Sequence, residues 1–143
     1  MLLEHIELFR QSVAAVKLTM PFEIVAWVVL PDHCHAVWRL PPDDDNYSGR
    51  WRLIKSKFVR LLKKHGVNIE MRTDGSALLW QRRFWEHTVT NEPDLNRCIE
   101  YCYINPLKHQ LVTRMRDWSY SSFHRDVALG LFPADWAGNG KLA

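Results

Sequence analysis

The chain has 143 residues, of which 47% are hydrophobic and 24% charged, and its formal net charge is +3. This composition suits one soluble domain with a sizeable core, and so small a charge does not by itself indicate a nucleic-acid partner. Three cysteines give no paired disulfide framework, and no apolar run approaches the ~20 residues that span a bilayer. Because the N-terminus also lacks the order of a secretory signal, we predict a cytoplasmic protein without a membrane partner.

The first forty residues predict a helix followed by a β-hairpin. Apolar residues recur at mostly helical spacing over 2–18. β-branched and aromatic residues are frequent over 22–30 and 33–40, and the turn residues Pro31-Asp32 lie between these segments. We therefore expect two antiparallel strands over the two ranges.

A polar loop and a second helix are predicted next. The loop covers 41–49 and contains three consecutive aspartates. Over 50–64, apolar residues at i, i+3, i+7 and i+10 predict an amphipathic helix whose apolar face is formed by Trp51, Ile54, Phe58 and Leu61. Aromatic and β-branched residues then predict a further strand from about residue 84.

The last part of the chain predicts two more helices. Asn91 is a candidate N-terminal cap for a helix from about 94 to 104. A residue before proline is disfavoured in helical geometry, so Pro106 should end this helix near Asn105. A short helix is predicted over 121–129.

Two histidines, His33 and His35, lie two residues apart at the start of the second strand segment. Residues i and i+2 of a strand point to the same face, so the two imidazoles would lie side by side. Two neutral imidazoles on one rigid face provide half of a divalent metal site. The alternative is a His-x-His pair that arises by chance and binds nothing.

A second candidate constellation lies in the segment Tyr101-Cys-Tyr-Ile-Asn-Pro106. On a helix, Tyr101 and Asn105 share a face, whereas Tyr103 points about 200° away from Tyr101. A phenol can act as a nucleophile toward a phosphodiester, with Mg²⁺ or Mn²⁺ polarising the phosphate. The two imidazoles and the Asn105 carbonyl oxygen would supply three ligands. The structural alternative places both tyrosines at the edge of the core.

Basic residues are concentrated in the helix predicted over 50–64, which contains no acidic residue. Surfaces of one charge sign neutralise phosphates, so we expect contact with nucleic acid. The alternative is an ordinary solvated face. The candidate DNA-binding residues are Arg50, Arg52, Lys55, Lys57, Arg60, Arg82, Arg83 and Lys108.

Four blocks of the sequence resemble the REP-associated tyrosine transposases, which belong to the single-tyrosine HUH transposases (His, bulky hydrophobic, His). The blocks are Leu30-Pro-Asp-His-Cys-His-Ala-Val-Trp38, Trp80-Gln-Arg-Arg-Phe-Trp-Glu-His87, Tyr101-Cys-Tyr-Ile-Asn-Pro-Leu-Lys-His109 and Trp118-Ser-Tyr-Ser-Ser-Phe123. They occur in the family's order and, with Asp135-Trp136, cover most of residues 22–136.

The resemblance implies a ferredoxin-like α+β fold, an antiparallel sheet backed by helices, in a single domain over residues 1–143. It implies a metal-dependent endonuclease and strand transferase that acts on single-stranded DNA near hairpins through a 5′-phosphotyrosine intermediate. His33, His35 and Asn105 would be ligands for Mg²⁺ or Mn²⁺, and Tyr101 would be the nucleophile. The implied partner is single-stranded or hairpin DNA, and a homodimer is one assembly that the sequence leaves open.

Two features depart from the family's pattern. Cys34 occupies the middle HUH position, where a bulkier residue is usual, although cysteine behaves as a small hydrophobe. The family's first strand precedes the first helix, whereas this chain opens at the helix. Loss of this strand would leave two unpaired edges in the sheet. Three explanations stay open: residues are missing before the first one given, another segment or subunit fills the gap, or the chain is a degraded copy. The rival function is a DNA-binding protein that keeps the fold but performs no cleavage. A hydrolase of small phosphoesters would need a second metal site, which the sequence does not suggest.

Overall fold

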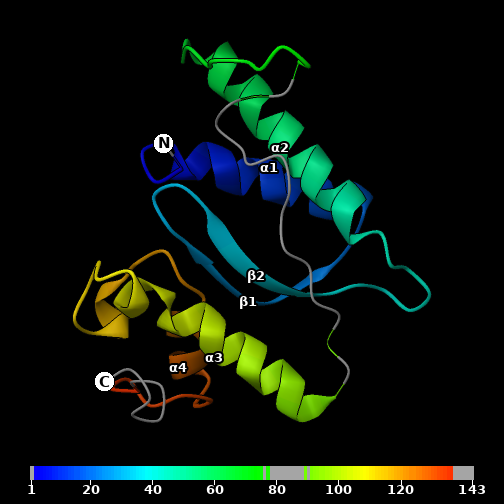
Figure 1. The fold of residues 1–143 in the computed structure, drawn as a ribbon. Helices are drawn as coiled ribbons and strands as arrows, with labels where there is room; N and C mark the ends of the chain where they lie inside the picture. The colour runs from blue at the N-terminus through cyan, green and yellow to red at the C-terminus, as the bar shows by residue number, and fades with distance from the viewer. Residues whose placement is uncertain (1, 76, 78–88, 90, 137–143) are drawn as a thin grey trace. The chain divides into compact units, whose positions relative to one another are not determined.

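The computed structural model describes residues 2–75, 77, 89 and 91–136 (Figure 1). Its elements are α1 (Ile6–Thr19), β1 (Glu23–Val29), β2 (Cys34–Arg39), α2 (Tyr47–Lys64), α3 (Glu92–Lys108), the 3-10 helix η1 (Met115–Asp117) and α4 (Phe123–Ala128). β1 and β2 pair as the predicted antiparallel hairpin, so the expected α+β class is confirmed. The chain forms two compact units, one built on α1 and α2, the other on β1, β2, α3, η1 and α4.

In the first unit, α1 and α2 pack through their apolar faces. Phe9 and Phe58 meet edge to face, with ring centroids 5.4 Å apart. The apolar face of α2 includes Leu62, which is fully buried, whereas the predicted Leu61 is only half-buried. The helix also begins earlier than predicted, because the Asn46 side chain accepts a hydrogen bond from the Gly49 backbone N–H and caps the first turn.

Arg50 joins α2 to the end of α1. Its guanidinium, 1% exposed, donates to the carbonyls of Met20 (3.1 Å) and Pro21 (2.9 Å). It also forms a two-pronged pair with Asp44, at 3.0 and 2.8 Å. This hydrogen bond, reinforced by the Asn46 backbone N–H, lowers the pKa of the Asp44 carboxyl to about 2. The polar loop before α2 is therefore held by a buried cation rather than by apolar packing.

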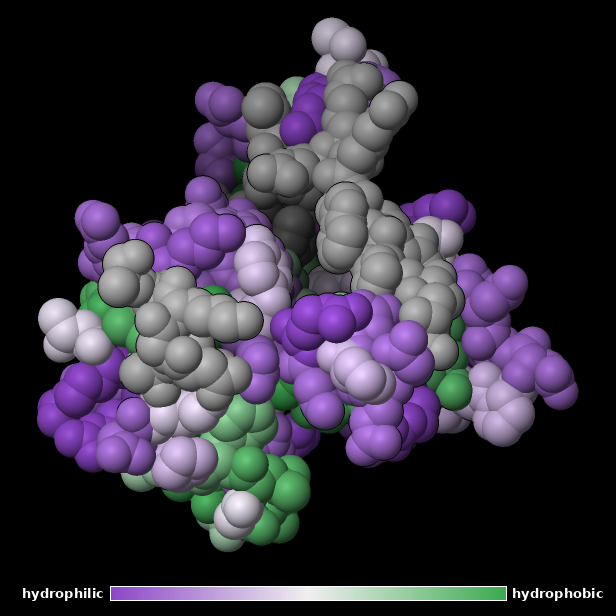
Figure 2. Space-filling view, turned by 60° about the horizontal axis from the view of Figure 1, so that its bottom comes forward, coloured by the Kyte–Doolittle hydropathy of each residue, from purple (hydrophilic) through white to green (hydrophobic). Residues whose placement is uncertain are grey.

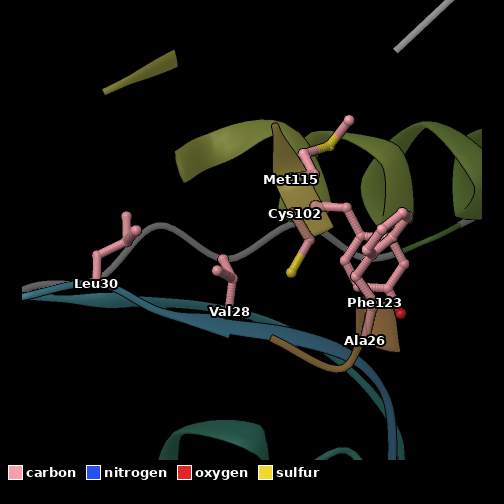
Figure 3. Close-up of a cluster of buried hydrophobic side chains, with 7 residues drawn as sticks. Ala26, Val28, Leu30, Cys102, Met115 and Phe123 are labelled. Carbon is pink, nitrogen blue, oxygen red and sulfur yellow. The ribbon is translucent and has the colours of Figure 1, made fainter. Parts of the chain in front are cut away.

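The core of the second unit lies between β1 and the helices that follow (Figure 3). Ala26 and Val28 of β1 and Leu30, directly after it, point to one side, where they meet Cys102 and Tyr103 of α3. Met115 and Phe123 complete this buried cluster. Because strand residues i, i+2 and i+4 share a face, one face of α3 packs against these side chains.

The other edge of β1 is paired by a segment near the end of the chain. The Val29 backbone N–H donates to the Tyr120 carbonyl (2.8 Å), and the Ser122 N–H donates to the Trp27 carbonyl (2.9 Å). Trp118 adds a bond from its indole N–H to the Val29 carbonyl (3.0 Å). Of the explanations left open by the sequence, another segment of the same chain therefore pairs this edge of β1, because the Trp118–Phe123 block satisfies its backbone groups.

The helix α3 begins as predicted but ends later. The Asn91 side chain accepts from the Asp94 N–H (2.9 Å) and caps the helix. Pro106 was expected to end the helix, yet α3 continues to Lys108. A proline in the last turn removes a single helical hydrogen bond, and the backbone bonds from His109 to Asn105 (2.9 Å) and from Leu111 to Pro106 (2.9 Å) hold the turn.

Some features predicted from the sequence lie outside the described residues or stay predictions. The strand expected from about residue 84 lies almost entirely outside the described residues, as do Arg82 and Arg83. Within the part of the chain that is described, the sheet consists of β1 and β2. The assignment of residues 1–143 to a single domain stays a prediction. Among the described helices, none is both long and apolar enough to cross a membrane.

Candidate metal and nucleophile site

The β-hairpin presents the two histidines of the His-x-His pair. His33 immediately precedes β2, and His35 is the second residue of that strand. The Nδ1 atom of His33 lies 2.6 Å from an Asp32 carboxylate oxygen. When Nδ1 carries the proton and donates it to this carboxylate, Nε2 becomes the ligand atom of the ring.

Three imidazoles form a cluster of the kind that binds a cation. His33, His35 and His109 each offer one ring nitrogen, and these atoms lie within 4.8 Å of one another. His109 follows the last residue of α3. Its contribution was missed in the sequence analysis, although Tyr101, Asn105 and His109 recur at i, i+4 and i+8, the spacing of one helix face.

Tyr101 lies on the same helix face and remains accessible. Its side chain is 49% exposed. The ring stands edge-on to His35, with centroids 5.6 Å apart and planes at 89°. Lys108 donates to the phenol oxygen over 3.3 Å. The predicted opposition of the two tyrosines of α3 is confirmed, because Tyr103 is only 1% exposed.

Asn105 is buried below Tyr101 and is held in one orientation. It is 0% exposed, and its Nδ2 donates to the Tyr101 carbonyl over 2.6 Å. Its Oδ1 atom is also buried and has no hydrogen-bond partner among the described residues. A buried amide oxygen without a partner is rare and requires an explanation, and a bound cation is one.

A thiol fixes the backbone at His35. Cys102 of α3 donates its S–H to the His35 carbonyl over 3.3 Å. Burial raises the pKa of the Cys102 thiol well above its ordinary value, so the group stays protonated and keeps donating. This bond joins β2 to α3 beside the ring contact of His35 with Tyr101.

Comparison with known proteins identifies the family. The family model described as "Transposase IS200 like" matches residues 3–104. A REP-associated tyrosine transposase of Escherichia coli is 46% identical over 133 residues, which are 93% of this chain and 73% of the relative. The chain is a member of the REP-associated tyrosine transposases. A putative member from Haemophilus influenzae is 42% identical over 143 residues, 99% of this chain and 81% of the relative.

A solved structure supports the same assignment. A REP-associated tyrosine transposase bound to a REP hairpin matches with a TM-score of 0.82 and 45% identity. The match covers 96% of this chain and 76% of that one. The chain is thus a transposase by family and by fold, and the predicted resemblance is confirmed.

The basic residues of this transposase differ in their surroundings. On α2, Arg52 and Arg60 are exposed, and Lys55 and Lys57 are half-buried. Arg50 belongs to the buried contact with Asp44, so its charge is used inside the protein. Apart from the grey atoms, the face drawn in Figure 2 is mainly hydrophilic, and its most extensive apolar area lies at the lower edge.

The donor set near Tyr101 fits a divalent cation. Imidazole nitrogens suit transition metals, and an amide oxygen suits hard cations. Mn²⁺ accepts both kinds of donor, whereas Mg²⁺ prefers oxygen. The histidine cluster offers imidazole nitrogens and the buried Asn105 side chain offers an amide oxygen, and each kind of donor suits such an ion.

Proposed function

We propose that this transposase is a metal-dependent endonuclease and strand transferase that acts on single-stranded DNA near hairpin repeats, with Tyr101 as its nucleophile. The observation that carries the proposal is the position of the Tyr101 phenol, half exposed and in edge contact with His35. The hairpin substrate is supported by the relative whose structure contains a REP hairpin. Action on cellular DNA agrees with the cytoplasmic location that the sequence predicts.

We propose His33, His35 and Asn105 as the residues that hold the cation, Mg²⁺ or Mn²⁺, with His109 as a further imidazole at the same place. When bound, the ion would polarise the scissile phosphate. The protein's own part is orientation. The Asp32 carboxylate orients His33, and the Tyr101 carbonyl orients the Asn105 amide.

In the cleavage step, the Tyr101 phenol oxygen forms a bond to phosphorus while the bond from phosphorus to the 3′-oxygen breaks. The phenol proton passes to solvent, and the departing 3′-oxygen takes up a proton to become a hydroxyl. The 5′-phosphate remains on Tyr101 as a phosphotyrosine. In the transfer step, a 3′-hydroxyl attacks this phosphodiester and the phenol leaves. The energy of the original bond is conserved, so strand transfer needs no nucleotide triphosphate.

The basic surface of α2 would bind the DNA backbone. Arg52, Lys55, Lys57 and Arg60 are proposed as phosphate contacts, together with Arg82, Arg83 and Lys108. The double variant Lys55→Ala/Lys57→Ala should bind all DNA sequences more weakly and reduce the slope of log affinity against log salt by about 1 to 2. An unchanged slope would remove these lysines from the proposed interface.

The test of the proposed chemistry uses end-labelled single-stranded DNA that contains a hairpin, incubated with the wild-type protein and Mn²⁺ or Mg²⁺. We expect a covalent protein–DNA product that EDTA prevents. Proteolysis and mass spectrometry should locate the phosphotyrosine on the peptide that contains Tyr101. If no adduct forms with either ion while the hairpin still binds, the protein is a DNA-binding protein without cleavage activity.

A further inference from the structure

We infer that Lys108 acts directly on the nucleophilic oxygen of Tyr101, in addition to any contact with DNA. This inference deepens the proposed function and rests on Tyr101 being the nucleophile. Lys108 lies in the last turn of α3, seven residues after Tyr101. Its ammonium nitrogen lies 3.3 Å from the phenol oxygen and 4.8 Å from the centroid of the ring.

Two contacts from one ammonium restrict the phenol. The hydrogen bond fixes the direction in which the oxygen points, and the cation over the ring face limits rotation of the side chain. A further contact comes from His35, whose ring stands edge-on to the tyrosine. The phenol therefore has contacts with both β2 and the last turn of its own helix, although Tyr101 is 49% exposed.

The charge of Lys108 acts at both chemical steps. An ammonium group donates hydrogen bonds but accepts none, so it does not take the phenol proton. It stabilises negative charge on the oxygen as the phenol attacks phosphorus. When a 3′-hydroxyl later attacks the phosphotyrosine, the same oxygen leaves with the bonding electrons, and the ammonium again offsets its charge. Cleavage and strand transfer should thus depend on Lys108 equally.

If Lys108 only bound a DNA phosphate, its replacement would have a different effect. Its removal weakens DNA binding but does not change the rate once the protein is saturated with DNA. If Lys108 instead holds the nucleophile, its replacement lowers the rate of adduct formation at saturating DNA and has little effect on the dissociation constant for DNA. The two roles are separated by measuring adduct formation in single turnover over a range of protein concentrations.

The experiment compares Lys108→Met, Lys108→Arg and Arg116→Gln with the wild type and with Tyr101→Phe, using hairpin-containing single-stranded DNA and Mn²⁺. Arg116 lies exposed on η1 and serves as the matched loss of one positive charge. We expect Lys108→Met to slow adduct formation and strand transfer at saturation about tenfold, with a dissociation constant within about threefold of wild type. Lys108→Arg should recover most of the rate, and Arg116→Gln should keep the wild-type rate.

Other outcomes overturn the inference in distinguishable ways. If Lys108→Met changes only the dissociation constant, Lys108 is a phosphate contact. If Arg116→Gln slows the reaction as much as Lys108→Met, the effect is one of overall charge. If the wild type forms no adduct, or Tyr101→Phe still forms one, the proposed function itself fails and the role of Lys108 fails with it.

Discussion

Each of the two opposite faces of α3 carries a tyrosine, and the two tyrosines have different surroundings. Tyr101 is 49% exposed and contacts His35 and Lys108, whereas Tyr103, two residues later, is 1% exposed. The Tyr103 hydroxyl donates a hydrogen bond to Asp126 and lies 3.0 Å from the Ser122 hydroxyl. The residue type therefore does not assign a role to a tyrosine, because the face of the helix determines what surrounds it.

The buried face also explains why the exposed face has a fixed direction. Ser122, which contacts Tyr103, accepts a hydrogen bond from the Trp27 backbone N–H of β1 over 2.9 Å. Tyr103 further packs edge-on against Phe123 and Phe132, at 5.5 and 5.3 Å between centroids. These contacts fix the rotation of α3 about its axis. Tyr101, about 200° away around the helix, is thereby turned outward.

The largest expected effect separates the two tyrosines by chemistry. Tyr101→Phe removes one oxygen atom, so adduct formation should fall by at least ~10³-fold while the free energy of unfolding changes by less than ~0.5 kcal/mol. Tyr103→Phe should form adduct at close to the wild-type rate when assayed below its melting temperature. Labelled hairpin DNA measures the first quantity and urea unfolding the second. The opposite pattern would exchange the proposed roles of the two residues.

The next effect concerns the cation and tests whether Asn105 or His109, which share the Tyr101 side of α3, is its ligand. Asn105→Ala should weaken Mn²⁺ binding about 10- to 100-fold, because the buried amide is held ready by the Tyr101 carbonyl. His109→Ala should weaken it about threefold, since His109 is exposed at the end of α3. Titration followed by electron paramagnetic resonance of free Mn²⁺ gives both constants. A larger loss in His109→Ala would make the imidazole the principal third ligand.

A smaller effect concerns stability and the buried face. Tyr103→Phe leaves the buried Asp126 carboxylate with one partner fewer, although the Arg125 guanidinium still donates to it over 3.1 Å. We expect a loss of about 1 to 2 kcal/mol in the free energy of unfolding. Equilibrium denaturation by urea measures this loss, and Tyr101→Phe is the matched control on the exposed face. Equal stability of the two variants would show that the Tyr103 hydroxyl contributes nothing net.

The smallest effect is the pH dependence of that same contact. Burial, followed by the hydrogen bond to Asp126, raises the pKa of the Tyr103 phenol above its ordinary value of 10.0. Above pH 10 the unfolded chain loses this proton while the folded protein keeps it, so stability falls with rising pH, by up to ~1.4 kcal/mol per pH unit for this group. The contribution is fully present below pH 10. Urea unfolding between pH 8 and pH 11 should show a shallower decline in Tyr103→Phe than in wild type.

The sequence by itself determined the local elements and the chemistry-bearing residue types. Helical spacing predicted Trp51, Ile54 and Phe58 on the apolar face of α2, with Leu61 in place of Leu62, and β-branched runs flanking Pro31-Asp32 predicted the hairpin. The two-residue spacing within α3 predicted that Tyr101 and Tyr103 face opposite ways. These features depend on contacts between near neighbours in the chain, for which periodicity is sufficient information.

Tertiary structure alone decided the features that join distant segments. Nothing in the spacing of Trp118 and Ser122 indicated that their segment pairs with β1, about ninety residues earlier. Arg50 shows the same limit. Its position in a basic helix predicted a phosphate contact, yet Asp44 and two backbone carbonyls surround its guanidinium. A charged side chain is buried only where the fold supplies all its partners, and those partners come from separate segments.

The C-terminal end of α3 depends on both local backbone preference and tertiary packing. Because helical geometry is disfavoured for a residue before proline, α3 was predicted to end near Asn105. This preference is a property of the local backbone only. In the folded protein, Leu107 packs against the buried cluster and backbone bonds from beyond the helix hold the last turn, so α3 continues through Pro106. This extra turn carries Lys108 to the Tyr101 oxygen. Packing decided the length of the helix because its free energy exceeds the loss of one hydrogen bond at Pro106.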